Sequence, residues 1–361
     1  MPQKKYKITA LVDSATVPQD DPQFLILPKT PTTEYYVIQT IRQLGHEVTI
    51  TPVEDDIIAV ANQLRQQKPS LVFNMTEEFG GDRQKDKNIA AMLELLEIPF
   101  TGTGSVGLML CRDKILCKQI LTYHQIKVPD FLFFPLGEKI KLPKSIKFPM
   151  VVKPAFEDGS EGISNASIVN DVGALKQRIQ FVIKKWKQGA IAEEYIEGRE
   201  FYVGIIGNKK PVTLPIRECI FNNKNAAGPC LATYSVKWDE KYRRKWNVKF
   251  GFAKLDKTET EKIYQTCKQV YGLLQLRDYG RIDLRLTPDP LRRGRTAANN
   301  KIVILEVNAN PDVAKGEELA EAAKKAGIPY EKFIEQIILA AMARYRQQKI
   351  RNPKHEIRDK F

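Results

Sequence analysis

The residues best placed to do chemistry stand in two apolar segments near the end of the chain. The first, residues 279–286 (YGRIDLRL), alternates charged and apolar side chains. Alternation along a strand places Arg281, Asp283 and Arg285 on one face and the apolar residues on the other. Such charged groups need compensating partners, because burying an unpaired charge is costly.

The second segment, residues 301–308 (KIVILEVN), places Glu306 and Asn308 together on one face by the same alternation. If the two segments are neighbouring strands, Asp283, Glu306 and Asn308 converge as three oxygen donors. Oxygen donors without His or Cys favour Mg²⁺, which leaves coordination positions open for phosphate oxygens. The alternative is that two half-exposed strands turn their polar faces to water.

A candidate anion site follows the apolar segment 148–152. Lys153 ends this segment, and the loop 157–162 (EDGSEG) offers backbone amides that can close over a phosphate. The residue order is not that of a P-loop. Lys114 opens a predicted helix, where its sequence context fits a structural salt bridge and a ligand contact equally well.

Residues 192–200 (AEEYIEGRE) are predicted to form a strand, a turn and a strand with four carboxylates. This segment can place an acceptor for an adenine amino group, an apolar residue against the ring and a carboxylate for ribose hydroxyls. It can equally be an exposed hairpin.

Residues 102–107 (GTGSVG) match the GxGxxG dinucleotide fingerprint. However, they follow the fourth expected strand rather than the first, and the acidic residue expected farther on is represented only by Asp130 beside a proline. The three histidines, His46, His124 and His355, form no grouping that suggests covalent catalysis. An NAD-dependent oxidoreductase is therefore disfavoured.

The elements that must position these residues begin with alternating strands and helices, which predict a parallel, helix-covered sheet. The expected strands are residues 6–12, 47–53 and 70–75, and the expected helices are residues 33–44, 55–67 and 87–97. From Val106 a helical segment is expected to include residues 112–126. Farther on, we expect mostly strands over residues 190–308 and two closing helices near residues 317–326 and 330–345. The fold class is α/β and α+β in three lobes.

The composition is that of an ordinary globular protein, with 43% hydrophobic and 28% charged residues among 361. It excludes disorder, collagen and coiled coil as descriptions of the whole chain. No stretch is long enough to span a membrane, and the N-terminus has the pattern of neither a signal peptide nor an anchor. Five cysteines without a CxxC pair make a reduced, cytoplasmic location the expectation.

A net charge of +14 predicts attraction for anions. Basic residues concentrate at residues 237–249, 291–295 and 344–360. Nucleic acid, nucleotide phosphates and acidic peptides or polymers all fit this pattern, and so does a solvated basic surface.

Seven segments in order resemble motifs of the ATP-grasp superfamily, and most of all those of D-alanine–D-alanine ligases. They are residues 99–102 (PFTG), 112–114 (RDK), 152–154 (VKP), 157–162, 193–200, 280–283 (GRID) and 305–311 (LEVNANP). The resemblance implies a three-domain ATP-grasp fold with ATP held between two sheets. The implied parts are an N-terminal α/β domain (1–104), a central α+β domain (105–189), a C-terminal α+β domain (190–348) and a basic tail (349–361).

The resemblance also implies roles for individual residues. Lys114 and Lys153 correspond to ligands of the ATP phosphates, Glu193 and Ile196 to adenine contacts, and Glu200 to the ribose contact. Asp283, Glu306 and Asn308 correspond to the ligands of Mg²⁺, with two ions expected and Mn²⁺ as a substitute. Arg281 corresponds to the arginine beside the reacting carboxylate, while Lys237 and Ser160 lie in loops that close over the site.

The implied reaction has two steps. A carboxylate attacks the γ-phosphate to give an acyl phosphate, and an amine then displaces phosphate to leave an amide and ADP. The implied substrates are amino acids or peptides. We expect no association with a membrane, and the sequence leaves the oligomeric state open, a homodimer included.

Several positions depart from the D-alanine ligase pattern. The family's Gly-Gly-x-Ser-x-Glu stretch is replaced by residues 13–24, which begin with Asp13, and its loop serine is replaced by Gly159 with Ser160 adjacent. The family's Ser-Leu pair, which holds the acceptor carboxylate, aligns with Glu317 and Glu318. We therefore expect a carboxylate–amine ligase with a different substrate pair. The alternative is an inactive ATP-grasp protein that binds nucleotide, or acts with nucleic acid, in regulation.

Overall fold

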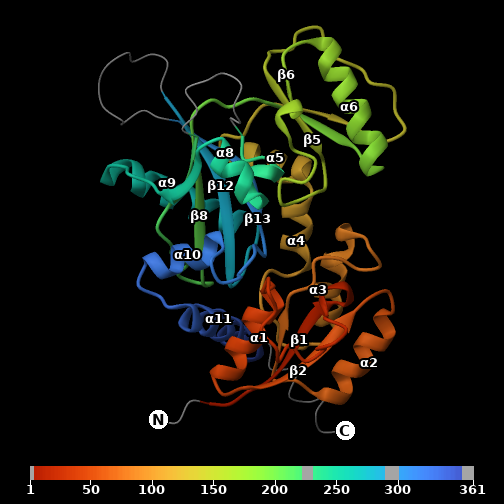
Figure 1. Ribbon diagram of the computed structural model, residues 1–361, viewed down its shortest axis with the longest axis vertical. Helices are drawn as coiled ribbons and strands as arrows, with labels where there is room; N and C mark the ends of the chain where they lie inside the picture. The colour runs from red at the N-terminus through yellow and green to blue at the C-terminus, as the bar shows by residue number, and fades with distance from the viewer. Residues whose placement is uncertain (1–3, 222–230, 289–300, 352–361) are drawn as a thin grey trace.

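The computed structural model describes residues 4–221, 231–288 and 301–351, which form three sheets with helices packed around them (Figure 1). The basic run at residues 291–295 and most of the segment between the two metal-site strands lie outside the described residues. No helix in the described ranges is long and apolar enough to cross a membrane.

The N-terminal sheet is parallel, as the alternating pattern predicts. Its strands lie in the order β2-β1-β3. The helices begin at side-chain caps: Thr32 accepts a hydrogen bond from the Tyr35 amide, and Asp56 accepts from the amides of residues 58 and 59. The elements are β1 (Lys7–Asp13), η1 (Ser14–Thr16), α1 (Thr33–Gln43), β2 (Glu47–Val53), α2 (Ile57–Gln67), β3 (Leu71–Asn74), η2 (Arg83–Lys85) and α3 (Asp86–Leu95).

The helical segment after Val106 consists of two helices, α4 (Ser105–Arg112) and α5 (Lys114–Tyr123). The break falls at Asp113, whose backbone is extended and whose carboxylate accepts hydrogen bonds from the amides of residues 115 and 116. An aspartate in this role ends one helix and starts the next. Lys114 is therefore the first residue of α5, as expected.

The central sheet has four strands in the order β4-β7-β5-β6. Its strands are β4 (Phe131–Phe134), β5 (Met150–Pro154), β6 (Ile168–Val169) and β7 (Ala190–Glu194), preceded by η3 (Asn165–Ser167) and covered by α6 (Val172–Trp186). Because β7 pairs with both β4 and β5, this sheet continues past the boundary that we expected between residues 189 and 190.

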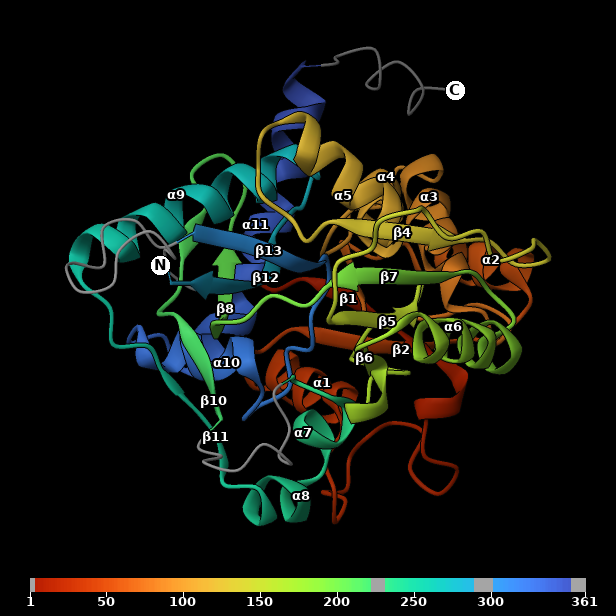
Figure 2. The same cartoon turned by 90° about the horizontal axis from the view of Figure 1, so that it is seen from above.

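The third sheet has six strands in the order β11-β10-β8-β12-β13, and β9 pairs with β8. The strands are β8 (Arg199–Ile206), β9 (Val212–Thr213), β10 (Arg217–Phe221), β11 (Val248–Phe252), β12 (Tyr279–Thr287) and β13 (Lys301–Asn308). Seen from above, the central and third sheets lie side by side (Figure 2).

Helices occupy more of residues 190–308 than expected. They are α7 (Tyr234–Trp238), α8 (Glu240–Lys245) and α9 (Lys257–Leu273). The prediction of mostly strands is wrong for α9, which buries Ile263, Cys267 and Val270 at helical spacing and begins at the Asp256 cap. Its many charged residues hide this apolar stripe in the sequence.

The prediction that β12 and β13 are neighbours is confirmed. They pair antiparallel, with Asp283 opposite Glu306 and Arg281 opposite Asn308. The alternate side chains of β12, at positions 282, 284 and 286, are buried in the apolar core. The core therefore fixes which face of β12 carries the charges.

The chain closes with α10 (Glu318–Lys325) and α11 (Tyr330–Arg351). Helix α11 packs against α1 and β3, so the last helix lies beside the N-terminal sheet (Figure 1). Its Arg344 pairs with the fully buried Asp278 through an Nη2–Oδ2 distance of 2.9 Å. The same Nη2 donates to the carbonyl of Phe100 at 2.8 Å, and this contact ties the C-terminal part to the N-terminal part.

The GxGxxG segment serves packing between these parts. A Cβ on Gly102 would lie 2.7 Å from the Asn310 side chain, and one on Gly107 would lie 2.9 Å from the Gln275 carbonyl. The Gly102 amide donates to the carboxylate of Asp278. These glycines permit close approach of protein to protein, which accounts for them without a dinucleotide.

Candidate functional site

Two cavities meet where the central and third sheets face each other. The smaller is about 80 Å³ and is lined by residues of both sheets, among them Lys153, Ser160, Glu193, Ile196, Glu200, Lys237, Asp283, Arg285 and Glu306. The larger is about 830 Å³ and takes in Arg281 and Asn308. Ten of the eleven site residues predicted from the sequence thus line one cavity or the other. The eleventh, Lys114, contacts Glu306 directly.

The acidic groups of β12 and β13 each face a cation. Arg281 donates from Nε and Nη2 to the two carboxylate oxygens of Asp283, at 2.7 and 3.0 Å. Lys237, on α7, holds its Nζ 3.9 Å from Asp283 Oδ2. Lys114 Nζ lies 3.0 Å from Glu306 Oε1. The charges at the shared end of the two strands are therefore compensated.

Glu306 is an ionised carboxylate in this environment. Burial alone would raise its pKa, but Lys114, followed by Lys153 and Lys237, holds the pKa of Glu306 far below its usual range. Burial likewise opposes the charge on Lys114, and Glu306 raises the pKa of Lys114 above its ordinary value. Each group therefore keeps the other charged.

The donor set suits a hard cation. Asp283 and Glu306 supply carboxylate oxygens, and the Asn308 amide has a buried end, Nδ2, with no hydrogen-bond partner in the described part of the chain. An amide with one unsatisfied end can turn its oxygen toward a cation. Among the described residues no cluster of three or more His, Cys, Asp or Glu side chains forms a metal site. The fit to Mg²⁺ therefore rests on two carboxylates and one amide.

Glu193 lies between two lysines of different elements. Its Oε2 is 3.0 Å from Lys153 Nζ, and its Oε1 is 3.2 Å from Lys118 Nζ. Lys118 also donates to the carbonyl of Leu305 on β13, which connects α5, the central sheet and the third sheet. Burial would raise the pKa of Glu193, but the two lysines lower it.

Sequence reasoning missed Lys118. The signal that could have found it is its spacing of four residues from Lys114, which places both lysines on one face of α5. Burial lowers the pKa of Lys118 despite its contact with Glu193. A nearly buried lysine between two sheets needs both of its acceptors.

The two loops expected to close over the site contact each other. Ser160 donates from its hydroxyl to the carbonyl of Ala232 at 2.8 Å, and Trp238 donates from its indole to the carbonyl of Gly159 at 3.1 Å. Ser160 has a φ of 64°, which its neighbours must stabilise. The glycine-containing loop is thus held against the segment that carries Lys237.

Arg112, at the end of α4, links this loop to the N-terminal part. Its guanidinium pairs with Asp86 of α3, and its Nη1 lies 2.5 Å from Asp158 of the loop. Burial raises the pKa of Asp86, while Arg112 opposes that rise. Within the RDK motif, Arg112 therefore holds the loop 157–162 through Asp158, and Lys114 contacts Glu306 in the site.

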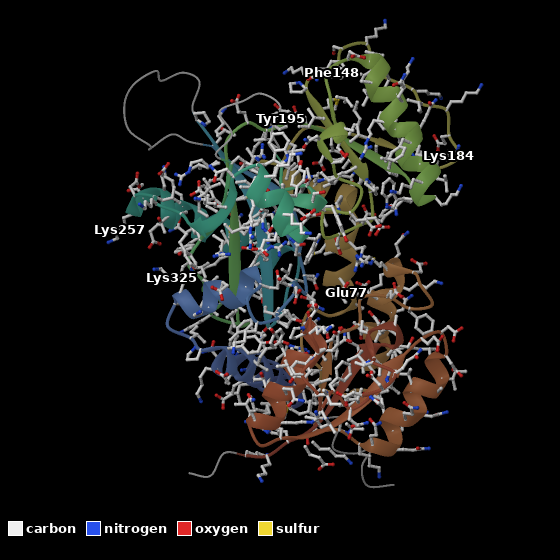
Figure 3. All side chains as sticks on the ribbon, viewed as in Figure 1. Glu77, Phe148, Lys184, Tyr195, Lys257 and Lys325 are labelled. Atoms are coloured by element: carbon white, nitrogen blue, oxygen red, sulfur yellow. The ribbon has the colours of Figure 1, made fainter. Side chains whose placement is uncertain are left out.

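The larger cavity has an acidic wall. Glu318 pairs with Arg217 at 3.0 Å, whereas Glu317 forms no ion pair within the described ranges. Burial, and then Asp312 and Glu318, raise the pKa of Glu317. Glu77 also lines this cavity, at the junction between the N-terminal sheet and the rest of the molecule (Figure 3).

Asp13 ends β1 at the carboxyl edge of the N-terminal sheet. Its Oδ2 accepts a hydrogen bond from the Glu77 amide at 2.9 Å, and its Oδ1 is buried without a partner among the residues that the structure describes. Burial raises the pKa of Asp13 to about 7, although the Glu77 amide opposes the rise. The folded protein therefore holds this proton to a higher pH than the unfolded chain does.

We expect Asp13→Asn to stabilise the protein at high pH only. A carboxyl whose pKa is raised by folding contributes its full stability below the unfolded value and loses it as pH rises through the folded value. The free energy of unfolding of the variant should match that of the wild type near pH 4 and exceed it by about 1–3 kcal/mol at pH 8. Urea unfolding at both pH values measures this, and an equal difference at both would contradict it.

Comparisons with known proteins find a matching family model and relatives that cover most of the chain. Residues 121–339 match the family model described as the C-terminus of D-ala D-ala ligase. A D-alanine–D-alanine ligase of Aquifex aeolicus is 30% identical over 84% of this chain and 92% of its own length. An uncharacterized protein of Sinorhizobium fredii, y4sG, is 28% identical over 86% of this chain and 87% of its own.

Solved structures show the same fold. The crystal structure of D-alanine–D-alanine ligase from Bacillus anthracis complexed with ATP has a TM-score of 0.69. It is 20% identical in sequence, and the match covers 95% of this chain and 99% of that one. The three-domain ATP-grasp fold expected from the sequence is thus confirmed.

Proposed function

The chain belongs to the D-alanine–D-alanine ligase family of ATP-dependent ligases, and we propose that it joins a carboxylate to an amine. We further propose that its two substrates are not a pair of D-alanine molecules. One observation carries the ligase chemistry of this proposal, while the acidic wall of the larger cavity carries the change of substrates. At the shared end of β12 and β13, two carboxylates and one amide stand among Arg281, Lys114 and Lys237. Such an array can bind a triphosphate together with a second anion, which would otherwise repel each other.

Within this array we propose that Asp283, Glu306 and Asn308 hold two Mg²⁺ ions, which Mn²⁺ can replace. When bound there, the metal would supply neutralisation of the phosphate charge during the transfer. Lys114 and Lys153 then bind phosphate oxygens as point charges at the buried end of the cleft. Their contacts with Glu306 and Glu193 hold both ammonium groups in place.

The proposed reaction has two steps. An oxygen of the donor carboxylate attacks the γ-phosphorus, the bond to the β-phosphate oxygen breaks, and ADP leaves. The acceptor nitrogen then attacks the acyl carbon and loses a proton, and phosphate leaves with the donor's oxygen. We propose that Arg281 stabilises the oxyanion formed in the second step, because its guanidinium lines the larger cavity and is held there by Asp283.

Closure of the two loops protects the acyl phosphate. The contacts of Ser160 with Ala232 and of Trp238 with Gly159 join the loops above the cleft. Water excluded in this way cannot hydrolyse the intermediate before the amine arrives. We propose that Lys237, carried on the same segment, follows this closure toward the phosphates.

The adenosine contacts are assigned to the segment that joins the sheets. We propose that Ile196 packs on the adenine ring and Glu200 binds the ribose. Glu193 lies between two lysines, so its proposed role near adenine includes the orientation of Lys153. We also propose that the central domain ends after Glu194, since β7 completes its sheet.

The acidic wall of the larger cavity supports a polar or cationic acceptor. Glu317 and Glu318 line this cavity and align in sequence with the Ser-Leu pair of D-alanine ligases. We propose that the carboxylate of Glu317, which forms no ion pair within the described ranges, repels the carboxylate of a second D-alanine. The basic surface supports a second possibility, a peptide or polymer whose acidic part lies outside the cleft. With either kind of acceptor, we expect that D-alanine is not the second substrate.

We expect no D-alanyl-D-alanine from this protein with ATP and D-alanine. The test is a screen of ADP release over amino acids and dipeptides, with mass spectrometry of the products. The proposal expects release that depends on a donor and an acceptor, with a product equal in mass to their sum minus water. Robust dipeptide formation from D-alanine would overturn the substrate assignment. Binding of ATP without turnover across the screen, with salt-sensitive binding of RNA, would overturn the ligase itself.

A further inference from the structure

Arg285 is a charged residue enclosed in the wall of the smaller cavity. Its side chain is 2% exposed, and its Nε and Nη2 both donate to Glu200 Oε2, at 3.1 and 2.7 Å. Its Nη1 donates to the carbonyl of Ile196 at 2.5 Å. The guanidinium also lies over the ring of Tyr195, 5.3 Å from its centre.

These contacts join two parts of the cavity wall that are separate in sequence. Ile196 belongs to the segment between β7 and β8, which connects the central sheet to the third sheet. Glu200 belongs to β8, directly opposite Arg285 in the β8–β12 register. One planar group therefore fixes the connecting segment and the carboxylate together, as the fork of donors on arginine allows.

The hydrogen bonds to Glu200 leave little of its carboxylate free. A carboxylate offers about four acceptor positions, two on each oxygen. Arg285 fills both positions on Oε2, and the Tyr202 hydroxyl donates to Oε1 at 2.9 Å. Within the described residues, one acceptor position on Oε1 has no donor, and Glu200 lines the smaller cavity.

Burying an arginine–glutamate pair in a protein core costs free energy of hydration. Apolar residues of similar volume are often as stabilising or more so, because both charges lose their hydration. The pair is therefore better explained by what it does to the cavity than by its contribution to stability.

We propose that Arg285 is a positioning residue that, with Tyr202, fixes Glu200 so that its carboxylate accepts from only one ribose hydroxyl of the bound nucleotide. This inference rests on the proposed function, in which Glu200 faces the ribose. It adds that the nucleotide site discriminates between the two ribose hydroxyls. Arg285 sets this discrimination through Glu200 and does not itself contact the nucleotide.

Calorimetric titration of the full chain with ATP, 2′-deoxy-ATP and 3′-deoxy-ATP, each with Mg²⁺, tests the proposal without knowledge of the other substrates. In the wild type, one deoxy analogue should bind at least about tenfold more weakly than ATP. This analogue lacks the hydroxyl that donates to Glu200, so a buried charged acceptor is left without its hydrogen bond. The other should bind within about threefold of ATP. Equal weakening of both analogues would overturn the inference.

The variants Arg285→Met and Arg285→Met with Glu200→Gln separate positioning from folding. The single variant leaves Glu200 unpaired and destabilises the protein, whereas the double variant removes both charges. In both, the ratio between the two deoxy analogues should fall to within about threefold. Arg344→Met removes a comparably buried pair outside the cavities and should lower the melting temperature while leaving that ratio intact.

The outcomes distinguish this inference from the function on which it rests. Absence of ATP binding in the wild type would overturn both. A Glu200→Gln variant that keeps the discrimination would overturn the assignment of Glu200 to the ribose, and the inference with it. If Glu200→Gln abolishes the discrimination while Arg285→Met preserves it, the proposed function stands and the role of Arg285 is overturned.

Discussion

Glu306→Gln is expected to lower kcat for ADP release by at least about 10³-fold. The substitution keeps the size of the side chain but removes its charge, so a proposed metal ligand is weakened and Lys114 loses its partner at 3.0 Å. Loss of several kcal/mol of charge stabilisation in the transition state corresponds to about this factor. Binding of ATP with Mg²⁺, measured by calorimetry, should weaken in parallel.

A matched substitution separates this effect from general loss of stability. Glu218→Gln removes a carboxylate of the same sheet that pairs with Arg199 at 2.8 Å and lines neither cavity. We expect this variant to retain kcat within about threefold, as an ion pair outside the site should. A Glu306→Gln protein that is folded by circular dichroism and keeps wild-type turnover would refute the assignment.

Arg281→Met is expected to lower kcat by about 10²–10³-fold with a smaller change in the KM for ATP. Arg281 faces the larger cavity while its guanidinium holds both oxygens of Asp283. Removal of a donor to a developing oxyanion costs about this much in enzymes of other families. Steady-state kinetics with the substrate pair found by the ADP-release screen measures the two parameters separately.

Arg281→Lys serves as the control, because it keeps the charge but not the two parallel hydrogen bonds to Asp283. We expect partial activity from it, since charge alone compensates Asp283 while orientation is lost. If Arg281→Met affected only the KM for ATP and left kcat unchanged, Arg281 would belong to nucleotide binding and not to the reacting carboxylate.

The strand pattern carried most of the predictive value for the site. Alternation alone placed Asp283 on the face opposite the buried apolar residues of β12 and placed Glu306 and Asn308 on the same face as each other. The structure confirms that β12 and β13 pair, with Asp283 opposite Glu306. This prediction succeeded because burial of one face fixes the register of a strand.

Other features depend on contacts between distant segments and could not be derived in this way. Lys118 reaches Glu193 from a helix 75 positions earlier in the chain, and Arg285 meets Glu200 across the β8–β12 register. Neither partner is visible in local periodicity. Helix α9 was missed for a different reason, because its apolar stripe of four buried residues is spread among charged ones.

The central claim, transfer of the γ-phosphoryl group to a carboxylate, is tested most directly by isotope transfer. The protein is supplied with ATP, Mg²⁺ and the donor found by the ADP-release screen, labelled with ¹⁸O in its carboxylate, together with its acceptor. The account predicts that one ¹⁸O atom per turnover appears in inorganic phosphate, because the donor's oxygen leaves with the phosphoryl group. Amide product formed while the released phosphate stays unlabelled would contradict it.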